Sequence, residues 1–393
     1  MNEQKQIVIT DVWGIKTLLY MEHNEIYDVV AGAWDENSSR LGNVYTGKVK
    51  NIVKNINAAF VEIQERVLCY LPLSESNMDT PIHCGDVVIV QIKKAAVKNK
   101  KAVATRFPEL VGRYCVISSA GKHRRISKKI TNQKTRDNLS QILSELEEEP
   151  YGILLRTQAE EAPPEAIMEE CRTLIARLHK IMEQGVYRTG FSLLYEEAPF
   201  FLSYLLGCRE GEIGRIVTDD PEVYSLLQEH VSKMGIPPRL QLYEDESFPI
   251  DKLYGITSRL KKAFDKRVWL KSGANLIIEP TEALTVIDVN TGKAVEGKRN
   301  KETTFFRINC EAAKEAARQI RIRGMSGIIL IDFIDMRDKD NERKLIHLLS
   351  DELKKDKIKA SIMDITKLGL IEITRMKKRP PLSEIYRGKI PDI

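Results

Sequence analysis

Two apolar segments of the chain, LTVIDVN (residues 284–290) and GIILIDFIDM (residues 327–336), are interrupted by acidic side chains. Asp288 and Asn290 are two residues apart, so on a strand both side chains point to the same face. A carboxylate within an apolar strand is costly to bury unless it is paired or holds a metal. Oxygen ligands, two of them carboxylate, suit Mg²⁺, with Mn²⁺ as the alternative. We therefore predict that Asp288 and Asp332 hold one such ion beside Asn290.

Asp335 follows Asp332 by three residues. On a regular strand two such side chains face opposite ways, so we expect only Asp332 to join Asp288. An alternative interpretation is that these acids cap strand ends or pair with nearby Arg, and either acid alone favours that alternative. Two apolar strands, each interrupted by Asp and with Asn290 in register, favour the metal site.

The segment between the two apolar strands, TTFFRINCEAAKEAARQIRIRG, is rich in Ala, Lys, Glu and Arg. Such composition predicts one long helix, with Thr303 or Thr304 as N-cap and Gly324 as the C-terminal stop. A strand, a helix and a second strand fit most simply into one sheet. The sheet would then bring the two acidic strands together.

Composition limits the class of protein. The chain has 393 residues, of which 42% are hydrophobic and 30% charged, with a net charge of +5. These values predict a globular protein of two to four domains. We expect no membrane insertion and a cytoplasmic location, because no apolar run is long enough to span a bilayer and no signal peptide is recognisable. Six scattered Cys without a CxxC pair indicate free thiols rather than a zinc cluster.

Residues 36–118 contain short strands separated by Gly, Asn and polar turns, a pattern typical of a small barrel. Aromatic and basic residues alternate in it, as in OB-folds that stack bases and bind phosphates of single strands. Phe60 could instead be core, because AAFV is apolar throughout, which makes Tyr70 the better surface candidate. The predicted RNA-binding residues are Tyr45, Lys48, Phe60, Tyr70, Lys98, Lys100 and Lys101.

Three motifs together indicate a family. VYTGKVKNIVKNINAAFVEI with CYLPLSE resembles the OB-type RNA-binding domain of the ribonuclease E/G family, and TVIDVNTGK and GIILIDFIDM resemble its metal-binding strands. The resemblance reaches to about Arg379 and is closer to the short ribonuclease G type. It implies a multidomain α/β fold, in which an OB barrel and a 5′-end sensor region are inserted into an RNase H-like subdomain and a DNase I-like catalytic subdomain follows.

The same resemblance implies the boundaries of these parts. The N-terminal strands, too short to hold a core alone, are expected to join a sheet completed later in the chain. The expected parts are the first RNase H-like strands at 1–35, the OB domain at 36–118, the sensor region at 119–210, the rest of the RNase H-like subdomain at 211–264, the catalytic subdomain at 265–379 and a basic, Pro-containing tail at 380–393.

GILLRT (residues 152–157) is typical of a buried strand that ends in Arg156 and Thr157. In the family, an Arg-Thr pair in this setting binds the 5′-terminal monophosphate of RNA. A guanidinium can hold a phosphate through two hydrogen bonds, and a hydroxyl can donate beside it. The alternative is an Arg that leaves the sheet edge for solvent.

The resemblance implies a single-strand-specific endoribonuclease for rRNA processing and mRNA decay. Asp288 and Asp332 would hold Mg²⁺, Asn290 would orient Asp288 or bind the ion through a water molecule, and activated water would give 3′-hydroxyl and 5′-phosphate ends. Two other interpretations remain: an RNA-binding assembly factor with a non-catalytic metal site, and a DNA-directed nuclease. The last is disfavoured because no segment resembles a duplex-reading helix.

One departure concerns zinc. After the strand matching GLIEITR the family commonly has Cys-Pro-x-Cys, through which two subunits share Zn²⁺ and form a tetramer. Here the segment is MKKRPPLSEIYRGKIPDI, without Cys, and we expect the family's small C-terminal domain to be missing as well. We therefore predict no zinc and a monomer or weak homodimer rather than a zinc-linked tetramer.

Overall fold

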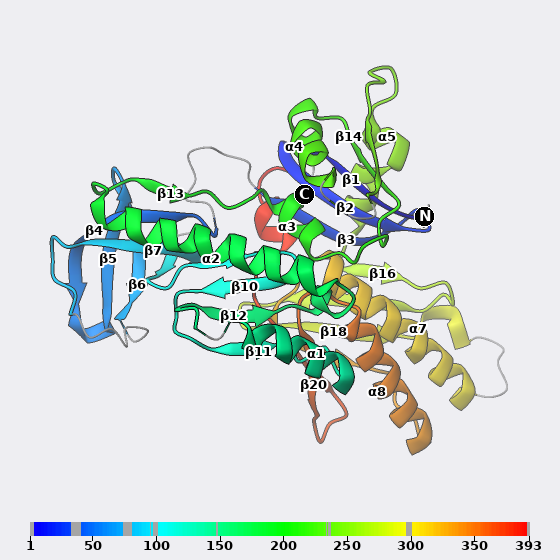
Figure 1. Ribbon diagram of the computed structural model, residues 1–393. Coiled ribbons are helices and arrows are strands. Elements are labelled where there is room, and N and C mark those ends of the chain that lie inside the picture. The colour runs from blue at the N-terminus through cyan, green and yellow to red at the C-terminus, as the bar shows by residue number, and fades with distance from the viewer. Residues whose placement is uncertain are drawn as a thin grey trace. The chain divides into compact units, whose positions relative to one another are not determined.

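The computed structural model describes residues 4–32, 41–73, 81–94, 96, 101–146, 148–232, 234, 237–295 and 301–390 (Figure 1). Two compact units divide the chain. The first unit is formed by Met1–Trp34 together with Glu210–Ile393, and the second by Asp35–Arg209. In sequence, the second unit is therefore an insertion into the first. Within the described ranges, no helix combines the length and apolar character needed to cross a bilayer.

The first unit begins with a five-stranded sheet of order β15-β14-β1-β2-β3. Strands β1, β2 and β3 form an antiparallel meander, and β14 pairs with β1 in parallel. The prediction that the N-terminal strands join a later sheet is thereby confirmed. The strands are β1 (Lys5–Val12), β2 (Ile15–Glu22), β3 (Glu25–Gly32), β14 (Arg215–Thr218) and β15 (Arg239–Leu242).

Short helices pack against this sheet. The helix α4 (Pro221–Val231) begins as its Asp-Asp-Pro sequence predicts, because Asp220 accepts hydrogen bonds from the backbone amides of Glu222 and Val223 at 2.8 and 3.1 Å. The remaining helices are α5 (Ile250–Tyr254), α6 (Ile256–Lys262) and α9 (Leu382–Ile385).

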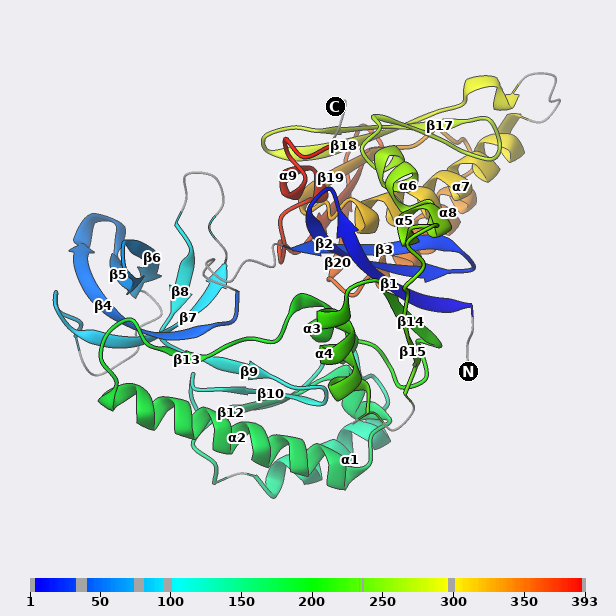
Figure 2. The same ribbon diagram turned by 90° about the horizontal axis from the view of Figure 1, so that it is seen from above.

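The first unit also contains a six-stranded sheet of order β16-β17-β18-β19-β21-β20. Its helices α7 (Lys301–Ile322) and α8 (Lys339–Lys354) lie on one face, as Figure 2 shows for β17 and β18. The opposite face is called the distal face below. The strands are β16 (Arg267–Trp269), β17 (Asn275–Pro280), β18 (Leu284–Asn290), β19 (Gly327–Asp332), β20 (Ala360–Ile365) and β21 (Ile371–Arg375).

The predicted long helix between the acidic strands is α7, and its start differs from the prediction. It begins at Lys301, so Thr303 and Thr304 lie inside the first turn and neither is the N-cap. Lys and Glu are good helix formers, which explains why the helix extends beyond the two Thr. Gly324, at φ +66°, ends the helical segment as predicted.

The second unit contains a closed five-stranded barrel of order β4-β5-β6-β8-β7, closed by pairing of β4 with β7. Its interior is apolar, and its closure makes it OB-like, as predicted. Outside the barrel, β13 (Leu193–Tyr195) pairs with β4. The barrel elements are β4 (Val44–Val53), η1 (Lys54–Ile56), β5 (Ala58–Gln64), β6 (Val67–Pro72), β7 (Val87–Lys94) and β8 (Val103–Thr105).

The remainder of the second unit is a four-stranded sheet of order β11-β12-β10-β9, with the long helix α2 lying along β10 (Figure 1). The segment LVGRYCVI, expected in the barrel, forms strands of this sheet instead, because β10 hydrogen-bonds to β12. The elements are β9 (Glu109–Val111), β10 (Cys115–Ser118), β11 (Arg124–Ile126), α1 (Gln133–Ser144), β12 (Gly152–Leu155), η3 (Thr157–Glu160), α2 (Pro164–Tyr187) and α3 (Phe200–Leu206).

A buried ion pair fixes the last strand of the six-stranded sheet. Arg375 donates from Nε to Asp356 Oδ2 at 2.8 Å and from Nη1 to the Met325 carbonyl at 2.8 Å. Both charged side chains are 4% exposed. Removing one partner of such a pair leaves an uncompensated charge in the interior.

We predict that Arg375→Ala lowers the free energy of unfolding by about 3–5 kcal/mol. Arg343 provides a matched control, because its ion pair with Asp340 is exposed on both sides, and Arg343→Ala is expected to cost about 1 kcal/mol or less. Thermal and urea unfolding of the two variants would measure the difference. Equal destabilisation would contradict a structural role for the buried pair.

Candidate functional site

The two predicted metal-ligating acids are brought side by side by the pairing of their strands. β18 and β19 run parallel, and their register sets Asp288 directly opposite Asp332. Ile287, Val289, Ile329 and Ile331 alternate with the acids and are buried against the helices. The acids therefore lie together on the distal face, at the carboxyl ends of both strands.

Asn290 lies on the same face and is hydrogen-bonded to Asp288. Its Nδ2 donates to Asp288 Oδ2 at 2.6 Å, which leaves the amide oxygen as an acceptor. Asp288 is half-buried, whereas Asn290 and Asp332 are exposed. Incomplete solvation of its carboxyl group raises the pKa of Asp332, and the charges of Asp288 and Asp335 raise it further. Negative charge is thus concentrated where oxygen ligands converge.

Asp335 is exposed and lies beyond the end of strand β19. β19 ends at Asp332, so the alternation of a strand does not extend to Asp335. Asp335 is close enough to contribute to the raised pKa of Asp332. Among the described residues, no group of three or more His, Cys, Asp or Glu side chains is placed to hold a metal. The candidate ligands are therefore two carboxylates and one amide.

Two side chains of α7 hold the segment that follows Asp332, and the sequence interpretation missed both. Asn309 is fully buried; its Nδ2 donates to the Ile334 carbonyl at 2.7 Å, and its Oδ1 accepts from the Ile334 amide at 3.1 Å. Glu302 accepts from the backbone amides of Arg337 and Asp338 at 3.0 and 3.1 Å. Helical periodicity could have identified Asn309, since it precedes Ala312, Ala313 and Ala316 on the buried stripe.

A close backbone approach fixes the turn after Asn290. Gly292 has φ +51°, and a Cβ there would lie 2.5 Å from the Gly273 carbonyl oxygen. A side chain larger than hydrogen is therefore excluded at this position. The turn after β18 is held against the turn between β16 and β17.

On the barrel, the structure separates the predicted RNA-binding residues. Phe60 and Tyr70 are opposite each other on β5 and β6, half-buried on the outer surface, with ring centroids 6.1 Å apart at 70°. Phe60 is thus not part of the barrel interior. Lys48 and Lys101 are exposed, whereas Lys98 and Lys100 lie outside the described residues.

The prediction that Tyr45 is part of the RNA-binding surface is wrong. Its side chain is 2% exposed in the barrel core, and its hydroxyl accepts from Asn43 Nδ2 at 3.1 Å. On β4, Tyr45 has the inward orientation because the strand alternates, so exposed Lys48 and buried Tyr45 point to opposite faces. We therefore remove Tyr45 from the proposed surface.

The predicted strand GILLRT is β12, which ends at Leu155, so the Arg-Thr pair comes directly after the strand rather than at its end. The Arg156 guanidinium donates to the Gly112 carbonyl, and burial lowers the pKa of Arg156. Thr157 begins η3, and its hydroxyl lies 3.1 Å from that of Ser127. Arg156 is half-buried rather than directed into solvent. Each side chain has a protein partner, and the sensor role stays a prediction.

A carboxylate of α2 organises the loop that Arg156 contacts. Glu170 accepts hydrogen bonds from the backbone amides of Arg113, Tyr114 and Cys115 at 2.7, 2.6 and 3.0 Å. Gly112 has no room for a Cβ, which would lie 2.5 Å from the Glu170 carboxyl carbon. The loop and the helix are thereby fixed to each other beneath Arg156.

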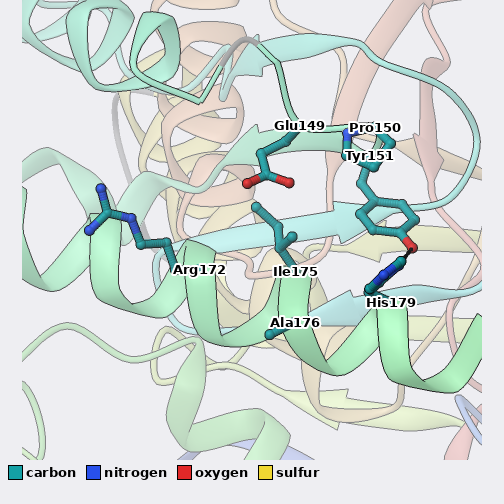
Figure 3. A pocket seen from close by; sticks show the side chains of 7 residues that line it. All are labelled: Glu149, Pro150, Tyr151, Arg172, Ile175, Ala176 and His179. Carbon is teal, nitrogen blue, oxygen red and sulfur yellow. Dashed lines mark hydrogen bonds between the residues drawn. The ribbon is translucent and has the colours of Figure 1, made fainter.

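A separate hollow of about 390 Å³ lies in the second unit between α2 and the segment before β12 (Figure 3). In it the Tyr151 hydroxyl lies 3.2 Å from His179 Nδ1, and His179 Nε2 lies 3.1 Å from Glu183. None of its lining residues was predicted as a site residue. They are Glu149, Pro150, Tyr151, Arg172, Ile175, Ala176 and His179.

The paired acids, the barrel and the Arg-Thr strand together define a class of multidomain α/β proteins with an OB-like barrel. Comparison with known proteins identifies the family. The profile of the Ribonuclease E/G family matches residues 109–378. The chain is 32% identical to Ribonuclease G of Salmonella typhimurium strain SL1344 over 371 residues, which cover 89% of this chain and 76% of that protein. The chain belongs to the Ribonuclease E/G family.

Longer relatives match over a smaller share of their length. Ribonuclease E of Synechocystis sp. strain PCC 6803 is 30% identical over 413 residues, covering 99% of this chain and 59% of that protein. Ribonuclease E of Escherichia coli strain K12 is 32% identical over 362 residues, covering 87% of this chain and 34% of that protein. The similarity therefore extends across both units.

Proposed function

We propose that the chain is an endoribonuclease that hydrolyses phosphodiester bonds of single-stranded RNA, leaving 3′-hydroxyl and 5′-phosphate ends. The observation that carries this proposal is the register of β18 and β19, which sets Asp288 beside Asp332. Membership of the family and the names of the relatives support the reaction class. We assign the activity to RNA processing and decay, including rRNA and mRNA.

The residues of the site fit a divalent cation with oxygen ligands. Asp288 and Asp332 would bind Mg²⁺, or Mn²⁺ in its place, and the ion would offset the negative charge that the strand register brings together. When bound, Mg²⁺ supplies a Lewis acid for the phosphate and activates water. Asn290 holds Asp288 in position through its amide. Asn309 and Glu302 fix the backbone beyond Asp332.

The arrangement of the sheets supports the expected subdomains. The order β15-β14-β1-β2-β3, with an antiparallel meander and two parallel strands, supports an RNase H-like subdomain. We assign the six-stranded sheet with α7 and α8 to a DNase I-like catalytic subdomain. The outer surface of the barrel at Phe60 and Tyr70 would bind single-stranded RNA.

Zinc and assembly stay predictions. Cys69, Cys115, Cys171 and Cys208 are buried as free thiols, and Cys310 is half-buried in α7. We propose a monomer or weak homodimer that needs no zinc link.

The direct test is incubation of the purified chain with a 5′-monophosphorylated oligoribonucleotide, with and without Mg²⁺. We expect endonucleolytic products only with Mg²⁺, and none from the matching DNA. RNA binding without cleavage under all metal conditions would contradict the proposal and favour an RNA-binding assembly factor with a non-catalytic metal site.

We predict that Asp288→Asn and Asp332→Asn each lower the cleavage rate at least about 100-fold, the scale of losing a group that stabilises transition-state charge. RNA affinity should change little, because each substitution removes ligand charge with little change in shape. The cleavage rate of Asp335→Asn, the matched control, should fall less. An inactive Asp335→Asn beside an active Asp332→Asn would reverse the assignment of the ligands.

We predict that Arg156→Ala slows cleavage of 5′-monophosphorylated RNA about 10-fold more than cleavage of 5′-hydroxyl RNA, since only the former offers a phosphate for charge-assisted hydrogen bonds. Arg124 is the control, because its guanidinium donates to backbone carbonyls of Tyr151 and Glu149 at 2.7 and 2.9 Å. Its substitution should affect both substrates alike. The same equal slowing for Arg156→Ala would leave Arg156 with only its structural bond to Gly112.

We predict that Phe60→Ala with Tyr70→Ala weakens binding of single-stranded RNA about 10-fold or more, because base stacking contributes about 1–3 kcal/mol per base. Tyr45→Phe serves as the control, since it removes only a hydroxyl in the barrel core. Fluorescence anisotropy with a labelled oligoribonucleotide measures both. Unchanged affinity of the double variant would place RNA elsewhere on the chain.

A further inference from the structure

An exposed tryptophan lies on the distal face that carries the paired acids. Trp269, on the edge strand β16, is 64% exposed, whereas its neighbour Val268 packs against the helix-covered core. A flat indole left in water on a sheet surface forgoes a large apolar burial. Sheets that present exposed aromatic rings are a recurring platform on which unpaired bases stack.

The strand register relates this ring to the acids. Arg267 pairs with Ile277, Ile277 with Asp288, and Asp288 with Asp332, so one transverse row of the sheet joins Arg267 to both carboxylates. Residues directly opposite each other on paired strands share a face. The Arg267 side chain is therefore on the face of the acids.

The adjacent row runs from Trp269 through Asn275 to Asn290. Neighbouring strands lie about 4.8 Å apart, so Trp269 is about 10 Å from Asn290 across the sheet. That separation exceeds contact distance. A base stacked on Trp269 therefore belongs to a nucleotide flanking the bond whose phosphate lies at the acids.

A positive charge accompanies the ring. The guanidinium carbon of Arg267 lies 5.5 Å from the centroid of the Trp269 ring, and Arg267 is exposed. Among the described residues no carboxylate is within ion-pair distance of Arg267. An aromatic ring can stack on a base, and an adjacent cation can bind the phosphate of the same nucleotide. The carboxylates in the same rows make this face a poor surface for burial against an apolar partner.

We propose that Trp269 and Arg267 form a base-stacking and phosphate-binding subsite for a nucleotide flanking the scissile bond. The proposal rests on the proposed function, because it takes the substrate at Asp288 and Asp332 to be single-stranded RNA. The subsite positions the strand across the distal face. It recognises any base with an open ring face, so it contributes affinity rather than strict sequence preference.

The first experiment is steady-state cleavage of an oligoribonucleotide by the full chain with Mg²⁺. Trp269→Ala should raise KM about 10-fold with kcat changed less than about 3-fold, and Trp269→Phe should restore most of the affinity. Phe248→Ala is the matched control, since Phe248 is an exposed aromatic (47%) of the same unit outside the sheet. It should leave KM unchanged. A KM for Trp269→Ala equal to that of the unsubstituted chain overturns the proposal.

A second experiment measures binding without cleavage. In the Asp332→Asn background, a series of oligoribonucleotides carries one abasic nucleotide at successive positions. At one position, the abasic nucleotide should weaken binding to the chain that contains Trp269. The same abasic nucleotide should cause no further loss of affinity in the Trp269→Ala chain, as expected for two groups that contact each other. If the losses of affinity from the abasic nucleotide and from Trp269→Ala are additive at every position, the stacking assignment is overturned.

The remaining outcomes separate this subsite from the proposed function. If the unsubstituted chain neither binds nor cleaves RNA, both fail. If it cleaves RNA and Trp269→Ala does so with the same KM, the subsite alone fails. If Trp269→Ala instead converts a dimer to a monomer in light scattering without changing RNA affinity, the ring is a subunit contact and the subsite is excluded.

Discussion

The parallel pairing of β18 with β19 is the constraint on which the candidate site depends. Parallel neighbours need a crossover connection, and here that connection is α7, whose Ala312, Ala313, Ala316 and Ala317 allow it to lie close to the sheet. The helix buries one face of both strands. The polar residues of both strands then lie together on the other face, so the packing of the core determines where the carboxylates meet.

This arrangement places like charges next to each other, which opposes ionisation of Asp332. The protein holds the acids and the segment beside them in place through hydrogen bonds from two side-chain amides and one carboxylate. An amide of Asn290 bonds Asp288, and α7 binds the backbone after Asp332 through Asn309 and Glu302. The same helix that closes the core therefore also orders the segment beside the acids.

Apolar periodicity and acidic interruptions were sufficient to predict β18, β19, the helix between them and the face shared by Asp288 and Asn290. They did not predict the start of α7, because Lys301 and Glu302 are themselves good helix formers. Tyr45 was misassigned because it was grouped with Lys48 on one surface, although two residues three apart on a strand face opposite ways. The position of Trp269 relative to the acids depends on long-range strand register, which single segments do not encode. Asn309 was overlooked although the helical periodicity of α7 places it on the buried stripe.

The insertion of the second unit between β3 and β14 has a consequence for synthesis of the chain. At ordinary translation rates β14 emerges on the order of ten seconds after β3, while the whole inserted unit is made in between. The barrel can close during that interval, since all its strands are local to it. The meander of β1 to β3 meanwhile has a bare edge at β1, which invites wrong strand pairing until β14 arrives. Because of this order of synthesis, the second unit can complete its fold before the first unit does.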